Sequence, residues 1–311
     1  MKAGFIGAGK VGFSLGRYFT ENNIEVTGYY SRSPESARKA ADFTNTRHYD
    51  SIESILGDSD TLFLTVPDGQ IASVWDHMRN LDIKNKNICH CSGSISSATF
   101  FHAETRGAKV YSVHPLYAVS DKFNSWKALK DAVFTMEGTP DGIEPLRKIF
   151  ESCGNRVVVM DGSKKALYHG AAVVCSNLTA GLFSVATQML QHCGFDQETA
   201  SQALVPLFLG NAQAIAERGP VDALTGPIER NDVGTVQKHF AAFDEVRHTS
   251  TNFAAKHGES ADGENANLEN AREIYRLLSE ELVKLAETRH PDRDYSELLE
   301  VLKNEKHCNH I

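Results

Sequence analysis

The stretch GAGKVG, residues 7–12, is the part of the sequence from which the fold is most directly inferred. It follows an apolar, β-rich run at residues 2–6 and opens an amphipathic helical pattern at residues 11–22. In this setting the three glycines allow a tight turn, the approach of a pyrophosphate to the backbone and close helix–strand packing. The alternative is a turn whose glycines serve packing only. The cofactor-binding residues predicted here are Gly7, Gly9, Lys10, Val11 and Gly12.

The rest of the chain divides into a β-rich half and a helical half. Strand-length apolar runs occur at residues 25–30, 61–66, 87–91, 109–114, 132–136 and 156–160, with helical patterns at 34–42, 70–79 and 142–153. Such alternation predicts a mostly parallel sheet that is covered on both faces. After about residue 163 only helical patterns remain, at residues 164–192, 197–218, 233–256, 268–288 and 295–302. We therefore predict an α/β protein, with a doubly wound Rossmann domain at 1–161 and an all-α substrate and dimerisation domain at 162–311.

The residues after the second strand indicate which dinucleotide is bound. Where such folds usually place an acid that grips a ribose, this chain has Ser31, Arg32 and Ser33. An acid would repel a 2′-phosphate, whereas the planar guanidinium binds phosphate through two hydrogen bonds. We therefore predict NADP(H), although Ser33 could simply cap the next helix. After a later strand, Val66 and Pro67 are placed to touch the nicotinamide ribose, unless this is a plain loop.

Polar residues after two neighbouring strands are the candidate catalytic groups. HCSGSIS places Ser92 and Ser94 after one strand, and SVHPLY places His114 after the next. In a parallel sheet these strand ends meet at one edge, where ligands bind. His114 is suited to proton transfer, and a serine hydroxyl could bind the same substrate atom. We predict His114 and Ser92 as catalytic and Ser94 as substrate-binding; the alternatives are a structural histidine and simple turn chemistry.

The helical half adds three polar candidates. His169 and Asn177 lie in the apolar pattern 164–192, where polar side chains must be paired or face a ligand. We predict that Asn177 orients the substrate in catalysis and that His169 binds it, with an interhelical hydrogen bond as the alternative. In LTGPIERND, residues 224–232, Arg230 could clamp an anionic substrate. It could equally cap a helix or pair with a neighbouring acid.

Composition limits the partners that we expect. A net charge of −8 and a pI near 5.9 argue against binding nucleic acid. Residues 1–6 run straight into a strand, so we expect no signal peptide, and polar residues within 171–190 argue against a membrane span. Six scattered cysteines suit a reducing cytoplasm, and their spacing predicts no metal site. The apolar helix 164–192 must be covered by other helices, which predicts a homodimer.

The motifs resemble a known family. GAGKVG, HCSGS, HPL, YHGAAVVCSN and LTGPIERND together resemble Rossmann-like proteins that carry the domain DUF2520 and are described as NADP-dependent or F420-dependent oxidoreductases. More distantly, the chain is similar to the 6-phosphogluconate dehydrogenase-like superfamily, including pyrroline-5-carboxylate reductase, prephenate dehydrogenase and 3-hydroxyacyl-CoA dehydrogenase. In the last of these a Ser, a His and an Asn line the substrate pocket. The matching positions here are Ser92 or Ser94, His114 and Asn177.

Two departures from the relatives bear on the mechanism. β-Hydroxyacid dehydrogenases and ketopantoate reductases place a catalytic Lys four residues before the helix Asn, and this chain has Val173 there. Hydroxyacyl-CoA dehydrogenases keep a Glu that orients their His, and no such acid follows His114. We predict an NADP(H)-dependent oxidoreductase that acts on a small carbonyl, imine or hydroxy-acid substrate. The alternative is a non-catalytic NADP(H) sensor that signals through its helical dimer.

Overall fold

The structure is a computed structural model that describes residues 1–257 and 270–303. It forms two compact units, Met1–Ser176 and Asn177–Ile311. The predicted boundary at 161/162 falls where the sheet ends, but Lys165 and Tyr168, in the first turn of the helix that follows, contact residues at the sheet, and the first unit extends to Ser176. Cys308 and the start of the predicted helix 268–288 lie outside the described residues.

The first unit is built on an 8-stranded sheet with the order β3-β2-β1-β4-β5-β6-β7-β8. Strands β1 to β6 are parallel, β7 is antiparallel to β6, and β8 is parallel to β7. The prediction of a mostly parallel α/β sheet is confirmed. The strands are β1 (Lys2–Ile6), β2 (Glu25–Tyr30), β3 (Arg47–Tyr49), β4 (Thr61–Leu64), β5 (Asn87–His90), β6 (Lys109–Pro115), β7 (Phe134–Gly138) and β8 (Val157–Val159).

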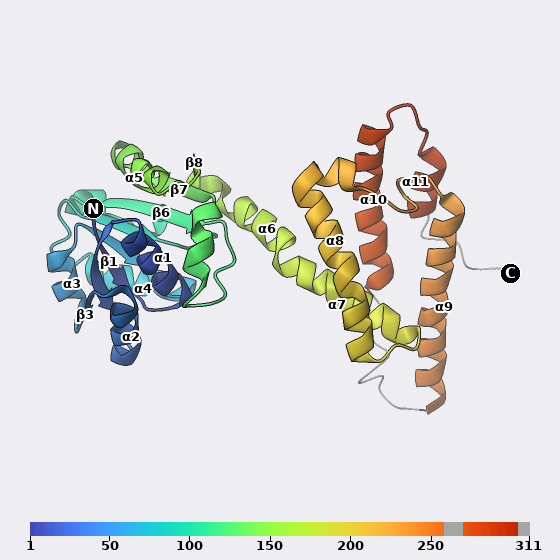
Figure 1. The fold of residues 1–311 in the computed structure, drawn as a ribbon, viewed down its shortest axis with the longest axis horizontal. Helices are drawn as coiled ribbons and strands as arrows, with labels where there is room; N and C mark the ends of the chain where they lie inside the picture. Colours follow the sequence, from blue (N-terminus) through green and yellow to red (C-terminus); the bar gives the residue numbers. More distant parts are fainter. Residues whose placement is uncertain (258–269, 304–311) are drawn as a thin grey trace. The chain divides into compact units, whose positions relative to one another are not determined.

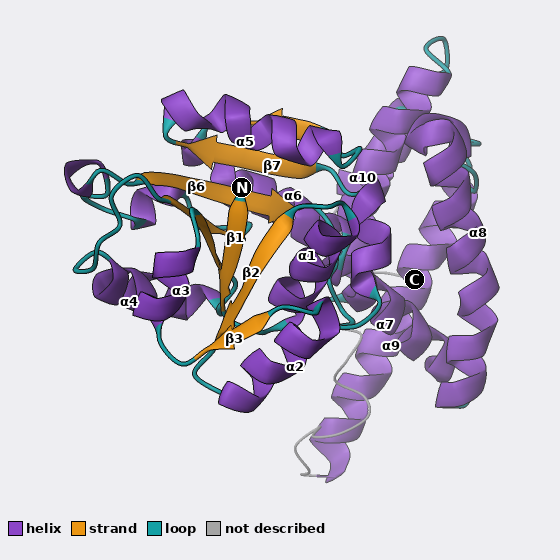
Figure 2. Cartoon of the chain, turned by 60° about the vertical axis from the view of Figure 1, so that its left-hand side comes forward, coloured by secondary structure: helices purple, strands orange, loops and turns teal. Residues whose placement is uncertain are grey.

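Helices cover both faces of this sheet, as Figure 2 shows. Alternate residues of β1 point to opposite faces: Phe5 packs with α1, α2 and α5, and Ile6 packs with α3 and α4. The helices are α1 (Lys10–Glu21), α2 (Pro34–Thr44), α3 (Ile52–Asp58), α4 (Asp68–Met78), α5 (Pro140–Ser152) and α6 (Lys165–Cys175). Short 3₁₀ helices lie at Ser97–Thr99, Glu104–Arg106, Ser125–Asp131 and Gly162–Lys164.

Strand β3 and helix α3 were not predicted. β3 has only three residues, RHY, and the first two are exposed, so it shows no apolar alternation. Helix α3 has seven residues and is capped by Ser51, whose hydroxyl accepts from Ser54 N. Both elements are too short to give a periodic hydrophobic signal.

The second unit is all helical (Figure 1). Helix α8 packs against α7 and α10, and α11 packs against α9 and α10. Leu224, Val236, Val283 and Leu298 are among the buried residues of its core. The helices are α7 (Asn177–His192), α8 (Gln197–Ala223), α9 (Val233–His257), α10 (Ala271–Arg289) and α11 (Ser296–Lys303).

The predicted helix 164–192 is divided at Ser176 into α6 and α7. By length and composition the stretch Gly162–His192 could cross a bilayer, since it contains an 18-residue window with a mean hydropathy of 1.4. Within one chain α7 has no buried residue, and Leu178 and Leu182 are exposed. A single chain therefore does not provide the covering that was expected for this helix, and its burial by a second subunit stays a prediction.

Candidate functional site

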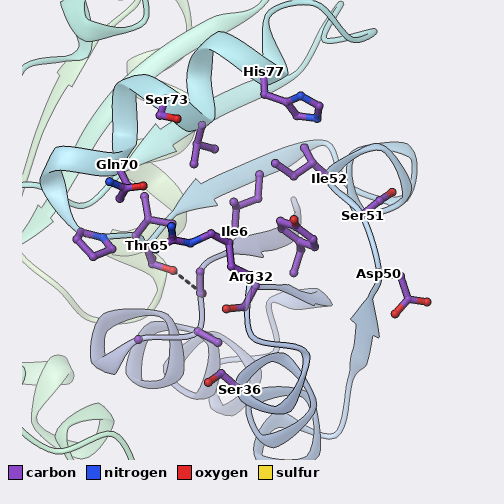
Figure 3. Close-up of a pocket in the computed structure, with 18 of the residues that line it drawn as sticks. Ile6, Arg32, Ser36, Asp50, Ser51, Ile52, Thr65, Gln70, Ser73 and His77 are labelled. Atoms are coloured by element: carbon purple, nitrogen blue, oxygen red, sulfur yellow. Dashed lines mark hydrogen bonds between the residues drawn. The ribbon is translucent and has the colours of Figure 1, made fainter.

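The turn between β1 and α1 is held by close backbone contacts that only glycine permits. Gly7 has φ +110°, and a Cβ there would lie 2.7 Å from the carbonyl oxygen of Thr65. A Cβ at Gly12 would lie 2.6 Å from the Gly7 oxygen, so helix and strand touch at this point. The hydroxyl of Thr65 donates to the Gly7 oxygen at 2.8 Å (Figure 3). The turn is thus pinned to the end of β4.

The same turn leaves room for a diphosphate. A Cβ on Gly9 would have its nearest neighbour at 3.7 Å, so the space in front of this residue is open. Gly9 is the N-cap of α1, and no side chain caps the helix. The first N–H groups of α1 therefore remain available to an anion. Lys10 is exposed and Val11 half-buried in this first turn.

A cavity of about 570 Å³ extends from this turn. Figure 3 shows Arg32 and Ser36 on one side, and Gln70, Ser73 and His77 of α4 on another. Its further lining comes from the ends of β1, β2 and β4, from the segment after β3 and from α4: Ile6, Gly7, Ala8, Gly9, Tyr30, Ser31, Asp50, Ser51, Ile52, Glu53, Thr65, Val66, Pro67 and Val74. Among the lining residues that the structure describes, Arg32 is the only arginine or lysine. The cavity therefore has one guanidinium at the place predicted for a 2′-phosphate.

Ser33 lies at the start of α2, beside the cavity. Its hydroxyl is the N-cap and accepts from Ser36 N at 3.3 Å, which is the capping alternative considered above. Ser31 and Ser36, but not Ser33, line the cavity. The sequence did not single out Ser36 because a serine in the first turn of a helix carries no distinctive pattern. Ser31 and Ser36 therefore place hydroxyls in the same cavity as Arg32, whereas Ser33 is used as a helix cap.

A second polar cluster begins in the loop after β5. Ser92 is buried, and its hydroxyl donates to Asp68 Oδ2 at 2.7 Å. Ser92 Oγ also accepts hydrogen bonds from Ser94 N at 3.2 Å and from Ile95 N at 3.1 Å. These bonds use its one proton and both lone pairs, so Ser92 holds the loop. Ser94 is exposed and donates to Asp68 Oδ2 at 3.1 Å, which makes it the better placed of the two hydroxyls for a ligand.

His114 and His169 meet on either side of a glycine. A Cβ on Gly93 would lie 2.9 Å from His114 Nε2 and 2.7 Å from His169 Cδ2. His114 Nδ1 lies 2.7 Å from the hydroxyl of Tyr168 on α6. Burial, assisted by Lys165 and His169, lowers the pKa of His114 from 6.5 to about 4. At neutral pH the imidazole is therefore uncharged.

Lys165 lies at the start of α6 and is 2% exposed. Its Nζ donates to the Ser92 carbonyl at 2.8 Å and to Ser112 Oγ at 2.7 Å. Burial lowers its pKa. The sequence gave no sign of this role, because the run DGSKK is typical of an exposed turn. Neither Lys165 nor Asp68 was among the predicted site residues.

A further buried histidine lies next to this cluster. His90, at the end of β5, accepts a hydrogen bond from Ser92 N at 3.2 Å through Nδ1. Burial lowers its pKa from 6.5 to about 4. Within residues 1–257 and 270–303, no group of three or more His, Cys, Asp or Glu side chains is placed to hold a metal ion.

The first unit thus brings together four of the predicted residues, Ser92, Ser94, His114 and His169. Asn177 begins α7 and belongs to the second unit.

Arg230 is exposed in the turn before α9, also in the second unit. The acids beside it have other partners. Glu229 lies 2.7 Å from His290 Nε2, and Asp232 accepts from Thr235 N at 3.0 Å.

Two family models match the chain. Residues 2–90 match a family described as NADP oxidoreductase, coenzyme F420-dependent. Residues 132–282 match DUF2520, a domain of unknown function, and this match includes β7 and β8 as well as the helical region. The predicted resemblance is confirmed, as is the prediction of NADP(H) as cofactor. The matches relate the chain to Rossmann-like NADP-dependent oxidoreductases. The sequence matches none of the curated proteins with which it was compared.

Solved structures share the fold. Protein TM1727 from Thermotoga maritima has a TM-score of 0.63 and 24% identity, over 92% of this chain and 98% of that one. A reductive aminase from Aspergillus terreus in complex with NADPH has a TM-score of 0.59 and 15% identity, over 96% and 98%. The pyrroline carboxylate reductase of Plasmodium falciparum with NADP bound has a TM-score of 0.52 and 14% identity, over 94% and 97%.

Proposed function

We propose that the protein transfers hydride between NADP(H) and a small carbonyl, imine or hydroxy-acid substrate. One observation carries this proposal. His114, His169 and Ser94 gather around Gly93 at the edge of the same sheet whose β1–α1 turn opens the dinucleotide cavity. In open α/β sheets this edge is where ligands bind. NADPH, when bound, supplies the hydride, and the chain supplies groups that bind and orient the substrate.

Each part of the chain has a distinct task in this proposal. The open space at Gly9 and the uncapped start of α1 receive the diphosphate, and Arg32 pairs with the 2′-phosphate. His114 Nε2 faces the substrate atom that gains or loses charge. Ser94 offers a hydroxyl, and Asp68 holds Ser94 and Ser92 in place. Asn177 and Arg230 remain candidates for substrate contact from the second unit.

The cofactor part is tested by Arg32→Ala. We expect NADPH to bind roughly thirtyfold more weakly, because a charge-assisted phosphate contact contributes about 2 kcal/mol, while NADH affinity stays unchanged. Titration calorimetry with both nucleotides measures this. Arg38→Ala is the matched control, since Arg38 is exposed on α2 and does not line the cavity. Equal losses for NADPH and NADH would contradict the assignment of Arg32.

The catalytic part is tested with a substrate panel and His114→Ala. The panel contains imines first, since structural neighbours are named as a reductive aminase, an imine reductase and pyrroline carboxylate reductases, and then keto acids. Consumption of NADPH is followed by absorbance. A slower variant with unchanged NADPH affinity supports the enzyme. The absence of turnover on every substrate would favour the sensor, which keeps the cofactor site and uses it without chemistry.

We further propose that the protein is a cytoplasmic homodimer formed through the second unit. Val205, Leu207 and Leu209 of α8 are 42%, 63% and 58% exposed, as on a surface that a partner covers. A membrane is the other apolar environment that could receive Gly162–His192. Lys165, however, is buried against the sheet residues Ser92 and Ser112, so the first turns of this stretch are already packed on the protein.

A further inference from the structure

The hydrogen bond between His114 and Tyr168 bears on the form in which the imidazole meets its ligand. His114 lies at the end of β6, and Tyr168 faces it from α6. The Tyr168 hydroxyl lies 2.7 Å from Nδ1, and the two rings are perpendicular, at 88° with centroids 5.6 Å apart. The Nδ1 edge of the imidazole is therefore occupied by a phenol.

The opposite edge of the ring faces Gly93. A Cβ there would lie 2.9 Å from Nε2 and 3.0 Å from Cε1. In the part of the chain that the structure describes, Nε2 has no hydrogen-bond partner. Gly93 therefore packs closely against this edge of the ring, and any larger residue there would have to displace the imidazole. This edge lies at the end of the sheet where the substrate is proposed to bind.

A buried cation lies beside this pair. Lys165 Nζ donates to Ser112 Oγ at 2.7 Å, and Ser112 is two residues before His114, on the same face of β6. The ammonium is also 5.6 Å from the centre of the Tyr168 ring. A fixed positive charge at this place disfavours a second positive charge on the imidazole.

We propose that Tyr168 is a positioning residue whose hydroxyl donates to His114 Nδ1, so that His114 is neutral and presents its proton on Nε2 to the substrate. The inference rests on the proposed function only for the identity of the ligand atom. The tautomer itself is a property of the protein alone.

The electrostatic surroundings support this arrangement. The charged and titratable groups that act on His114 are Lys165 and His169 of α6, Asp68 of α4 and His90 of β5. After burial, which comes first, Lys165, His169 and His90 lower the pKa of His114, whereas Asp68 raises it. Glu137 of β7 acts on Lys165 instead and favours its charged form.

The phenol is the donor of this bond for a simple reason. Burial raises the pKa of Tyr168, so its hydroxyl keeps its proton. That proton needs an acceptor, and His114 Nδ1 lies 2.7 Å from the hydroxyl. The hydroxyl of Thr135 on β7 also interacts with the phenol and lowers its pKa, which is the effect of a donor to the phenol oxygen. A neutral imidazole that accepts at Nδ1 carries its hydrogen on Nε2. The reverse orientation would direct the phenolic proton to Thr135 Oγ1, which has no partner at hydrogen-bond geometry among the described residues.

In the proposed reaction the neutral His114 therefore offers a hydrogen-bond donor at Nε2, whereas an imidazolium would act as an acid. In the reductive direction the substrate carbon gains a hydride, with its electron pair, from NADPH, which is oxidised to NADP⁺. The π pair of the C=O or C=N bond moves to the heteroatom, where Nε2–H stabilises the charge and water supplies the final proton. A neutral imidazole can act in this way as an electrophile. A carboxylate at Nδ1, as in the related dehydrogenases, would instead favour the imidazolium.

The test is the tautomer of His114 in the free protein, read from ¹⁵N chemical shifts of the imidazoles. We expect protonated Nε2 and unprotonated Nδ1 in the wild type between about pH 5.5 and 8. In Tyr168→Phe we expect a mixture of tautomers. Tyr275→Phe is the matched control, because Tyr275 makes the same contact with the exposed His239 at 2.8 Å; it should leave the His114 signals unchanged.

Three results would overturn the inference: protonated Nδ1 in the wild type, an imidazolium at neutral pH, or an unchanged tautomer in Tyr168→Phe. If Tyr168→Phe does not fold, the wild-type spectrum alone still decides the orientation. With a substrate in hand, Tyr168→Phe should lower kcat about tenfold with little change in KM. The expected tautomer without turnover on any substrate would support this inference while counting against the proposed function.

Discussion

The His114–Tyr168 and His239–Tyr275 pairs have almost the same geometry in very different surroundings. Their hydrogen bonds are 2.7 and 2.8 Å long, and both ring pairs are perpendicular, with centroids 5.6 and 5.5 Å apart. The first pair lies against a buried lysine and Gly93, whereas His239 is exposed on α9. The contact alone therefore does not make a site. What distinguishes His114 is the burial around it, the buried ammonium of Lys165 nearby and the close packing of its Nε2 edge against Gly93.

The two units also differ in the side chains that they bury and expose. In the first unit, buried polar groups such as Ser92 and Lys165 are hydrogen-bonded, as burial requires. In the second unit, α7 and much of α8 expose apolar side chains. The first unit thus completes its own polar site, whereas the second unit presents a surface suited to another protein chain.

The largest expected effect concerns that exposed surface. Leu209→Glu should dissociate the proposed dimer, because burying an unpaired carboxylate in the interface costs about 4 kcal/mol. Sedimentation equilibrium of the full chain measures the change. Gln197→Glu, which adds the same charge at the start of α8, should leave the dimer intact. A wild-type protein that is monomeric at all concentrations would show that α8 is truly exposed and would contradict the dimer.

The next effect is on the pH dependence of stability. His114 has a pKa of about 4 in the fold and 6.5 ordinarily, so the unfolded chain binds more protons between these values. Its contribution is fully present above pH 6.5 and is lost as the pH falls towards 4, by roughly 3 kcal/mol. His114→Gln should therefore flatten the fall in the free energy of unfolding over this range, as measured by urea denaturation. His239→Gln should not. Identical slopes for His114→Gln and wild type would mean that His114 is not held neutral.

The smallest effects come from two glycines. Gly93→Ala should destabilise the fold by about 1–3 kcal/mol, because its methyl group must displace His114 or His169. Gly210→Ala, in the interior of α8 with no atom within 4 Å of the new Cβ, should stabilise the chain by about 0.5–1 kcal/mol through helix propensity. Thermal unfolding compares the two. A loss of stability in Gly210→Ala would indicate that a partner packs against this residue.

Much of the fold could be predicted from local sequence patterns. The elements that were not predicted are those whose local pattern is too short or carries no information on packing. The apolar strands and the glycine turn predicted the Rossmann domain, and Arg32 led to the prediction of NADP(H) as the cofactor. Strand β3 was not predicted, because three partly exposed residues show no hydrophobic periodicity. The partner that covers helix 164–192 could not be identified, because hydropathy shows that a surface is apolar but does not show what covers it.

The local order of residues was enough to establish the sheet, the dinucleotide turn, the choice of NADP(H) and the strand ends that carry Ser94 and His114, since these depend on periodicity and on spacing along the chain. Packing alone established that Lys165 reaches Ser112, that Tyr168 covers Nδ1 of His114 and that the Ser92 hydroxyl is already fully bonded. Lys165 and Ser112 are 53 residues apart. Contacts across such distances, and the pKa values that follow from burial, arise only when the helix closes over the sheet.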